Sequence, residues 1–206
     1  MDIIQVLPKN VANQIAAGEV IQRPASVVKE MLENSLDAGA KTLKLYLKDS
    51  GKTLIQVVDD GSGMNANDAQ MCFERHATSK IKKITDLSKI KSMGFRGEAM
   101  ASIAAISHVE LCSKTKNDTV GTKIIIEGGE IKEQKPYNLI HGTSIKIKNL
   151  FYNVPARRKF LKSDQVEMRH IITEFNRIAL ANPNIQMELS HNEKTIIHVN
   201  ESNLRQ

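Results

Sequence analysis

The stretch from Arg23 to Gly39 most constrains the fold, because it predicts one helix with both ends marked and two unlike faces. Pro24 suits the first turn of a helix, and Gly39 suits the position just past its end. Apolar residues recur on one side with the helical period, and polar residues recur on the other. The apolar set is Val28, Met31, Leu32 and Leu36, and the polar set is Glu30, Glu33, Asn34 and Asp37. One face therefore packs against a core, and the other presents three carboxylates and an amide.

This polar face has two interpretations. An acidic helix face is usually solvated, but such a face normally interleaves lysines, and here the one pair at i,i+4 spacing, Lys29 with Glu33, has the weaker orientation. Glu30 and Asn34 lie one turn apart. An amide oxygen can bind Mg²⁺ while most of the ion's shell stays water, and a nearby carboxylate can take a proton from an attacking water. The helix thus leaves open a solvated face or a hydrolytic site.

Length and composition predict one globular domain over residues 1–206, since 41% of the residues are hydrophobic and 25% are charged. Cys72 and Cys112 follow no metal-ligand or disulfide spacing and are expected to be core thiols of a reducing compartment. No basic region precedes an apolar run at the N-terminus, and no segment approaches the roughly 20 apolar residues of a membrane span. We expect a soluble intracellular protein with no membrane partner.

The net charge of +6 permits a polyanionic partner such as DNA, bound through its phosphates without sequence preference. Three tyrosines, five phenylalanines and no tryptophan disfavour a stacking platform for single strands. Basic residues 156–160 are, taken alone, more often a solvated turn than a nucleic-acid contact. The six histidines show no metal-ligand spacing, and we expect them to be structural.

The periodicity of the chain predicts an α+β fold, a two-layer sandwich with a mixed, largely antiparallel sheet covered by helices. A long polar loop with one short helix is expected over residues 75–93. Besides the helix described above, helices are predicted at 8–21, 66–74, 97–106 and 163–181. Strands are predicted at 42–48, 53–58, 108–114, 121–127 and 143–148, with a hairpin at 185–199.

Several glycine-containing segments bear on phosphate or base binding. Residues 51–53 resemble the tail of a P-loop, but position 46, where the first glycine would stand, is Tyr46. Residues 61–66 match a loose dinucleotide fingerprint, yet they follow an antiparallel hairpin and not the first strand of a βαβ unit. Asp59, Gly61 and Gly63 instead suit a turn whose carboxylate accepts from a flat ligand such as adenine, although a plain acidic turn would look the same.

Residues 92–99 open a predicted helix with Gly94 and Gly97, which would leave backbone N–H groups free for an anion or simply form a helix cap. Residues 76–80 precede it with hydroxyls and an ammonium that could close over phosphates, or that could be solvated. Gly142 and Thr143, entering a late strand, carry little signal alone.

Taken together, the order of these signals resembles that of the GHKL ATPases, whose members include gyrases, heat-shock chaperones, sensor histidine kinases and MutL. Segments 13–20, 33–40, 75–81, 94–99 and 151–160 are similar to the MutL family of DNA mismatch repair proteins over nearly the whole chain. The resemblance implies an ATP-binding Bergerat fold. It implies that Glu30 is the general base, that Asn34 binds Mg²⁺, and that Asp59 accepts from the adenine amine.

The resemblance also implies contacts for the remaining motifs. Gly63 and Met64 should lie beside the base, with Thr143 behind it, and Thr78 and Lys80 should lie in an ATP lid. Gly94, Arg96 and Gly97 should line the phosphates.

For the whole protein, the resemblance implies an ATP-dependent homodimer in the bacterial cytosol, associated with the nucleoid. It would act on DNA and signal to other repair proteins such as a MutS-type mismatch sensor. The family's transducer domain, which supplies a lysine to the γ-phosphate, and its C-terminal dimerisation domain lie beyond Gln206, so weak hydrolysis is expected of this chain. Two alternatives are a DNA scaffold that holds nucleotide without turnover and a histidine kinase catalytic domain.

Overall fold

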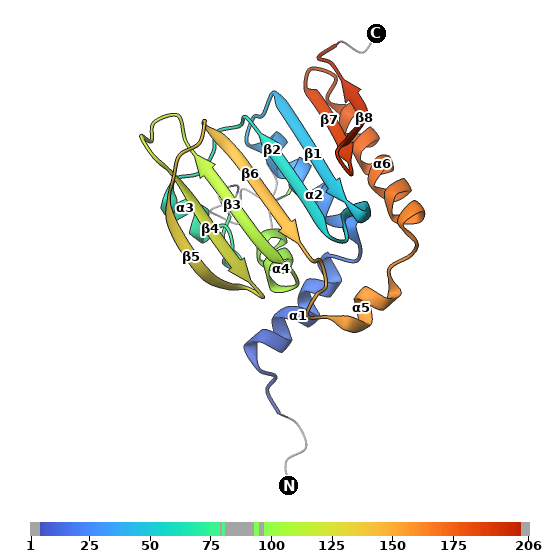
Figure 1. Ribbon diagram of the computed structural model, residues 1–206. Helices are drawn as coiled ribbons and strands as arrows, with labels where there is room; N and C mark the ends of the chain where they lie inside the picture. Colours follow the sequence, from blue (N-terminus) through green and yellow to red (C-terminus); the bar gives the residue numbers. More distant parts are fainter. Residues whose placement is uncertain (1–4, 79, 81–92, 95–96, 203–206) are drawn as a thin grey trace.

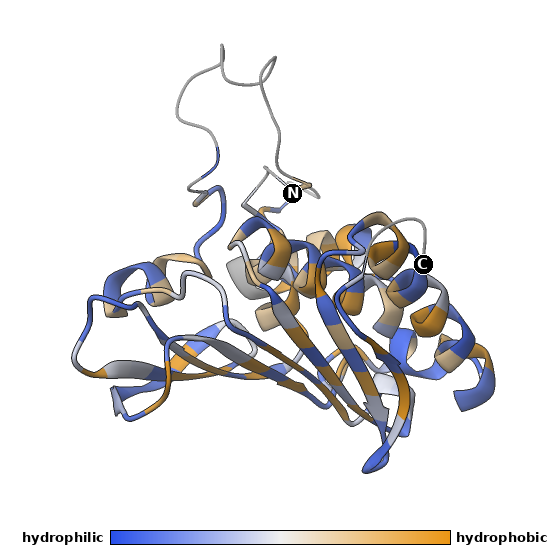
Figure 2. Cartoon of the chain, turned by 90° about the horizontal axis from the view of Figure 1, so that it is seen from above, coloured by the Kyte–Doolittle hydropathy of each residue, from blue (hydrophilic) through white to orange (hydrophobic). Residues whose placement is uncertain are grey.

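A computed structural model describes residues 5–78, 80, 93–94 and 97–202 (Figure 1). These residues form two layers, an eight-stranded sheet and a set of helices that covers one face of it (Figures 1 and 2). The predicted α+β sandwich is therefore confirmed. In the described part of the chain, none of the helices combines the length and the apolar character that crossing a bilayer requires.

The sheet has the strand order β5-β4-β3-β6-β2-β1-β7-β8. Within the described ranges, β1 and β7 are the one parallel pair, and the other neighbours are antiparallel, as the predicted mixed sheet requires. The strands are β1 (Thr42–Lys48), β2 (Leu54–Asp59), β3 (His108–Lys114), β4 (Gly121–Glu127), β5 (Glu130–Tyr137), β6 (Gly142–Lys148), β7 (Gln186–His191) and β8 (Lys194–Val199).

The helices predicted at 8–21, 23–39, 66–74, 97–106 and 163–181 are present within the usual uncertainty of helix ends. Most of residues 75–93, where a further short helix was predicted, lies outside the described residues. The helices are α1 (Lys9–Val20), α2 (Pro24–Asp37), α3 (Ala66–Met71), α4 (Ala99–Ala105), α5 (Pro155–Phe160) and α6 (Asp164–Ala181), with a short 3-10 turn η1 (Asp49–Gly51) between β1 and β2. Two elements were missed by the sequence analysis. The edge strand β5 is almost wholly exposed and shows no apolar alternation, and the basic segment 156–160 forms most of the short helix α5.

The core lies between α2 and the sheet. Leu43, Leu45 and Leu47 of β1 alternate with exposed or half-buried residues, and each is at most 2% exposed. Val28 and Leu32 of α2 are fully buried, which confirms the predicted core face of that helix. Since burying one such side chain contributes roughly 1.5–3 kcal/mol, this face fixes the rotation of α2 about its axis.

The two cysteines carry free thiols, as expected. Cys112 is buried in β3, and the partly buried Cys72 packs against the core. Burial raises the pKa of the Cys72 thiol to about 12. Burial also raises the pKa of the Cys112 thiol. Both thiols therefore stay protonated at neutral pH and act as small apolar side chains.

Candidate functional site

The site is organised by Asn34 and Ser35, two consecutive residues of α2. Pro24 occupies the first turn of this helix, and Gly39 follows its end in the left-handed region at φ 76°. Asn34 accepts a hydrogen bond from the ammonium of Lys80, with 3.2 Å between Nζ and Oδ1. Ser35 donates to the carboxylate of Asp59, with 2.8 Å between Oγ and Oδ2. Because neighbouring residues of a helix point about 100° apart, one turn of α2 reaches both ends of the site.

Asp59 ends β2 with a carboxylate that already accepts several hydrogen bonds. Ser35 donates to one oxygen, the backbone N–H of Gly61 lies 3.0 Å from the other, and the backbone N–H of Thr143 is close enough to lower the pKa of this carboxylate. Burial raises the pKa of Asp59, although these three donors act in the opposite direction. A carboxylate has about four lone-pair sites, so one acceptor position remains for a further donor.

The adjacent Asp60 has a different, structural role. Its Oδ1 accepts from the backbone N–H groups of Lys41 and Thr42 at 2.7 and 2.8 Å, which fixes the start of β1. Burial opposes ionisation of this carboxylate, but the hydrogen bonds from Thr42 and Lys41 outweigh it and lower the pKa of Asp60. Of the two consecutive aspartates, the exposed Asp60 thus fixes the backbone of β1, whereas Asp59 is the half-buried one.

Two glycines beside Asp59 have no room for a side chain. Gly63 has φ 68°, and a Cβ atom there would collide with the carbonyl oxygen of Lys114. Gly142 has φ 116°, and a Cβ atom there would collide with the carbonyl oxygen of Asp59. Backbone from β2, β3 and β6 therefore meets closely at this end of the sheet, and only glycine fits at these two positions.

Ser113 holds these segments together, and the sequence analysis missed it. Its fully buried hydroxyl accepts from the backbone N–H of Met64 at 2.9 Å, donates to the carbonyl oxygen of Gly142 at 3.1 Å, and lies 2.9 Å from the hydroxyl of Thr143. A serine at a strand position that faces the core was the available signal, since a buried hydroxyl needs partners.

At the other end of the site, also beside the last turn of α2, the two predicted phosphate segments meet. The backbone N–H of His76 donates to the carbonyl oxygen of Gly97 at 3.1 Å, and Gly97 has φ 63° with no room for a Cβ atom beside Ala77. The hydroxyl of Thr78 accepts from the backbone N–H of Lys80 at 3.2 Å. The structure thus brings Thr78, Lys80 and Gly97 to one end of α2.

Lys80 also forms an ion pair with Asp37, the last residue of α2, and a Cβ atom on Gly94 would lie 3.6 Å from its Nζ. The backbone N–H of Met93 donates to the other oxygen of Asp37 at 3.2 Å. Arg96 and most of the predicted lid lie outside the described residues, so those predictions remain untested.

Glu30 lies on α2 one turn before Asn34 and is half-buried. Within the described ranges its carboxylate makes no hydrogen bond or ion pair, so its oxygens are available as proton acceptors. On the same face, burial raises the pKa of Glu33, with the nearby charge of Lys29 opposing the shift and those of Glu30 and Asp37 adding to it. The helix face is thus partly desolvated, unlike a simple solvated acidic stripe.

A metal ion at Asn34 would have few protein ligands. Over the described ranges, no group of three or more His, Cys, Asp or Glu side chains could hold a metal. The amide oxygen of Asn34 does hold a cation, the Lys80 ammonium. This donor set fits Mg²⁺, which keeps several waters and takes one or two protein oxygens together with substrate phosphates.

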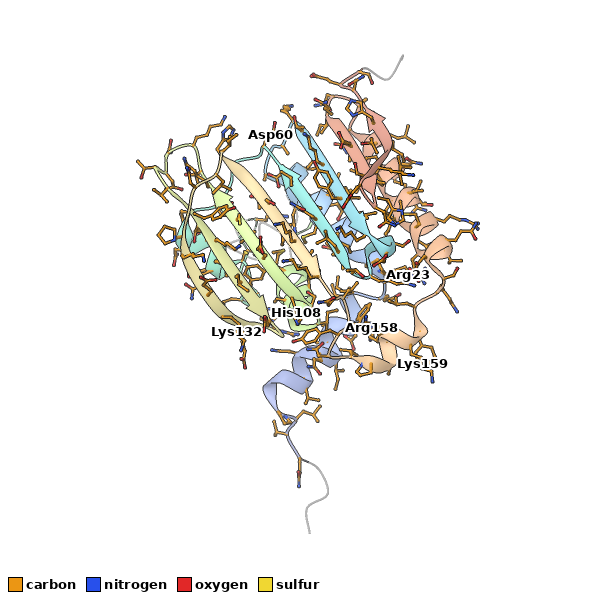
Figure 3. All side chains as sticks on the ribbon, viewed as in Figure 1. Arg23, Asp60, His108, Lys132, Arg158 and Lys159 are labelled. Carbon is orange, nitrogen blue, oxygen red and sulfur yellow. The ribbon has the colours of Figure 1, made fainter. Side chains whose placement is uncertain are left out.

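The basic residues of α5 lie away from this site. Arg158 and Lys159 project from the opposite end of the sheet to Asp60 (Figure 3). Arg157 of the same helix donates to the carbonyl oxygen of Ile21 at 3.2 Å and lies over Gly18, which ties α5 to α1. The segment that resembled a solvated basic turn thus has one structural member and two exposed ones.

Comparison with known proteins identifies the class. Residues 22–156, about two thirds of the chain, match the model of the family described as histidine kinase-, DNA gyrase B- and HSP90-like ATPases. The chain belongs to this family, as the GHKL resemblance predicted. Within it the chain falls among the MutL proteins of DNA mismatch repair, to which it is similar over its whole length.

Two curated relatives show this similarity. The MutL of Christiangramia forsetii is 62% identical over 100% of this chain and 33% of its own length, and that of Flavobacterium psychrophilum is 59% identical over 99% and 33%. The chain therefore spans about one third of the relatives that it matches. Among solved structures, the Aquifex aeolicus MutL ATPase domain complexed with ADP is 30% identical, with a TM-score of 0.72 over 90% of this chain and 67% of that one.

Proposed function

We propose that this chain binds ATP and hydrolyses it with Mg²⁺ as the ATPase region of a MutL-type mismatch repair protein. One observation carries the proposal, the paired contacts of Asn34 and Ser35. Through them a single turn of α2 touches both Asp59 and Lys80. A nucleotide needs such an arrangement, with base recognition at one end and a cationic phosphate site at the other.

At the base end, Asp59 accepts from the adenine amine, directly and through water, with the acceptor position that its protein donors leave open. Gly63 and Met64 lie beside the ring, held by Ser113. Thr143 backs the pocket from β6, where it pairs with Asp59 in the sheet register. The similarity to a MutL domain complexed with ADP supports this assignment.

At the phosphate end, Asn34 would hold Mg²⁺ through its side-chain oxygen, and the ion would neutralise phosphate charge. Thr78, Lys80, Gly94 and Gly97 meet the phosphates, and Arg96 is proposed to join them. Glu30, one turn from Asn34, accepts the proton of the water that attacks the γ-phosphate. These roles extend the predictions made from the sequence.

The test separates binding from chemistry. Glu30→Ala should keep nucleotide affinity and lose hydrolysis by about 10²- to 10⁴-fold, because the carboxylate acts on water. Asp59→Asn should lose binding, because the amide turns a donor toward the adenine amine and leaves buried groups unpaired, at roughly 1–3 kcal/mol. Calorimetry and phosphate release measure the two effects, with Glu33→Gln as a control on the same helix face. Retained turnover in Glu30→Ala, or unchanged affinity in Asp59→Asn, would contradict the assignment.

Beyond this chain, we infer that the longer protein uses ATP as a dimerising switch that couples a mismatch sensor of the MutS type to later repair steps. The net charge of +6 supports a sequence-independent contact with DNA phosphates. Because the chain spans about one third of its MutL relatives, we infer that another part of the longer protein supplies a lysine to the γ-phosphate and that this region alone hydrolyses ATP weakly. Turnover of the longer protein with and without DNA distinguishes this switch from a scaffold that holds nucleotide unchanged.

A further inference from the structure

The ammonium of Lys80 donates to the side-chain oxygen of Asn34, the same oxygen that would hold Mg²⁺ in the proposed function. Its Nζ lies 3.2 Å from Oδ1 of Asn34 and forms an ion pair with Asp37. Asn34 and Asp37 are three residues apart on α2, so their side chains are neighbours on one face of the helix. The Lys80 and Asp37 side chains are only 20% and 13% exposed, which weakens the screening of this pair by water.

The surroundings favour a cation at this point. Asp37 is the last residue of α2, where the partial negative charge of the helix C-terminus attracts positive charge. Gly94 also lies near the ammonium, since a Cβ atom on this glycine would be 3.6 Å from Nζ. An ammonium has three donors and no acceptor, so it satisfies oxygens of this kind much as a metal ion does.

We propose that Lys80 is a replaceable cation that competes with Mg²⁺ for Asn34. Without nucleotide, Asp37 anchors the ammonium on the Asn34 oxygen. When nucleotide and Mg²⁺ bind, the oxygen of Asn34 passes to the metal, and Lys80 moves from Asp37 to the phosphates. Asp37 is therefore a positioning residue that holds Lys80 back and lowers the affinity for the metal–nucleotide complex. This inference rests on the proposed function.

Two other roles for Asp37 predict different results. If Asp37 were a second metal ligand, its loss would weaken binding of the metal–nucleotide complex. If it were only a negative charge near the phosphates, its loss would strengthen binding whether or not Lys80 were present. A role that acts through Lys80 disappears with Lys80, which a double-mutant cycle detects.

The experiment measures the affinity of the 206-residue chain, whose described residues share one continuous core, for ADP with Mg²⁺ by calorimetry. We expect Asp37→Asn to raise the affinity roughly three- to tenfold, the scale of a partly exposed ion pair. In the Lys80→Met background the same substitution should change affinity by less than about twofold. Glu33→Gln, which removes a charge from the same face without touching Lys80, serves as the control and should also change affinity by less than about twofold.

A second readout follows Lys80 itself. Without nucleotide or metal, an amine-acylating reagent detected by mass spectrometry should modify Lys80 faster in Asp37→Asn than in the unmodified chain, while Lys29 reacts equally in both. Equal reaction of Lys80 in the two proteins would overturn the anchoring by Asp37.

The binding outcomes separate the inference from the function on which it rests. An affinity that falls in Asp37→Asn, that rises equally in both backgrounds, or that rises equally in Glu33→Gln would overturn the inference alone. If the unmodified chain bound no ADP with Mg²⁺, the proposed function would fail and the inference with it.

Discussion

Removing the hydroxyl of Ser35 should destabilise the chain through the charge of Asp59. Ser35 is 5% exposed and donates to the Asp59 carboxylate at 2.8 Å. Burial already raises the pKa of this carboxylate. A hydrogen bond to a charged group contributes about 1.5–3 kcal/mol, and alanine regains about 0.5 kcal/mol in helix propensity. Ser35→Ala should therefore lose about 1–2.5 kcal/mol of unfolding free energy at neutral pH.

The pH dependence identifies the cause. Because the folded pKa of Asp59 lies above its unfolded value, ionisation of this group opposes folding, and stability falls as pH rises through the interval between the two values. The Ser35 donor lowers the folded pKa and limits this fall. Ser35→Ala should widen the interval, so its deficit should be largest at neutral pH and smaller in acid, where Asp59 is protonated in both proteins.

Urea unfolding of the two proteins over a range of pH measures this deficit. Ser62→Ala is a matched control, because its exposed hydroxyl makes only a 3.4 Å contact with the carbonyl oxygen of Gly63, and its effect should stay within about 0.5 kcal/mol. A deficit in Ser35→Ala that is the same at every pH, or that does not exceed the control, would refute the reasoning.

Two further substitutions test the fold around the site. Gly142→Ala should lose about 2–4 kcal/mol of unfolding free energy, because φ 116° is strained for alanine and its Cβ atom meets the backbone of Asp59. Gly39→Ala, at φ 76° with open space around the Cβ position, should lose only about 1–2 kcal/mol. Similar losses for the two variants in urea unfolding would contradict the collision at Gly142. Glu110 has three lysines within 3.4 Å and a pKa lowered to about 2, with burial opposing the shift and hydrogen bonds from Lys146 and Lys148 outweighing it. Glu110→Gln should therefore lose about 1 kcal/mol of unfolding free energy at neutral pH. In urea unfolding this loss should vanish as pH falls from about 4.5 toward 2, or as salt is added. A loss that neither pH nor salt affects would exclude an ionic cause.

Much of the fold is readable from the sequence because local and tertiary preferences agree. Only one face of α2 is apolar, and only one face of β1 carries Leu43, Leu45 and Leu47, so the sequence already shows which face of each element is buried. The strand β5 (Glu130–Tyr137) has no such pattern, since it is an exposed edge strand placed by pairing with β4. No periodicity could have predicted it.

The site is readable in part for a similar reason. Asp59 and its glycines carry a local signal, since a strand end, a carboxylate and small residues follow one another in the chain. Ser35 contacts Asp59, 24 positions along the chain, and Ser113 contacts Met64, 49 positions away. Only the assembled fold brings residues so distant in sequence together. The pairing of Lys80 with Asn34 likewise joins residues 46 positions apart.

The burial of α2 decides which part of the site can move. Turning the helix by one residue would replace Ser35 by Asn34 as the partner of Asp59, and it would also take fully buried side chains such as Val28 and Leu32 out of the core. Each such side chain stabilises the packed state by roughly 1.5–3 kcal/mol, so this rotation is closed to the folded chain. The position of Asn34 relative to Asp59 is therefore fixed. Under the mechanism proposed for Asp37 and Lys80, the group that adjusts to a nucleotide is Lys80, because its contacts with α2 are two polar side-chain interactions that a metal ion and phosphates would replace.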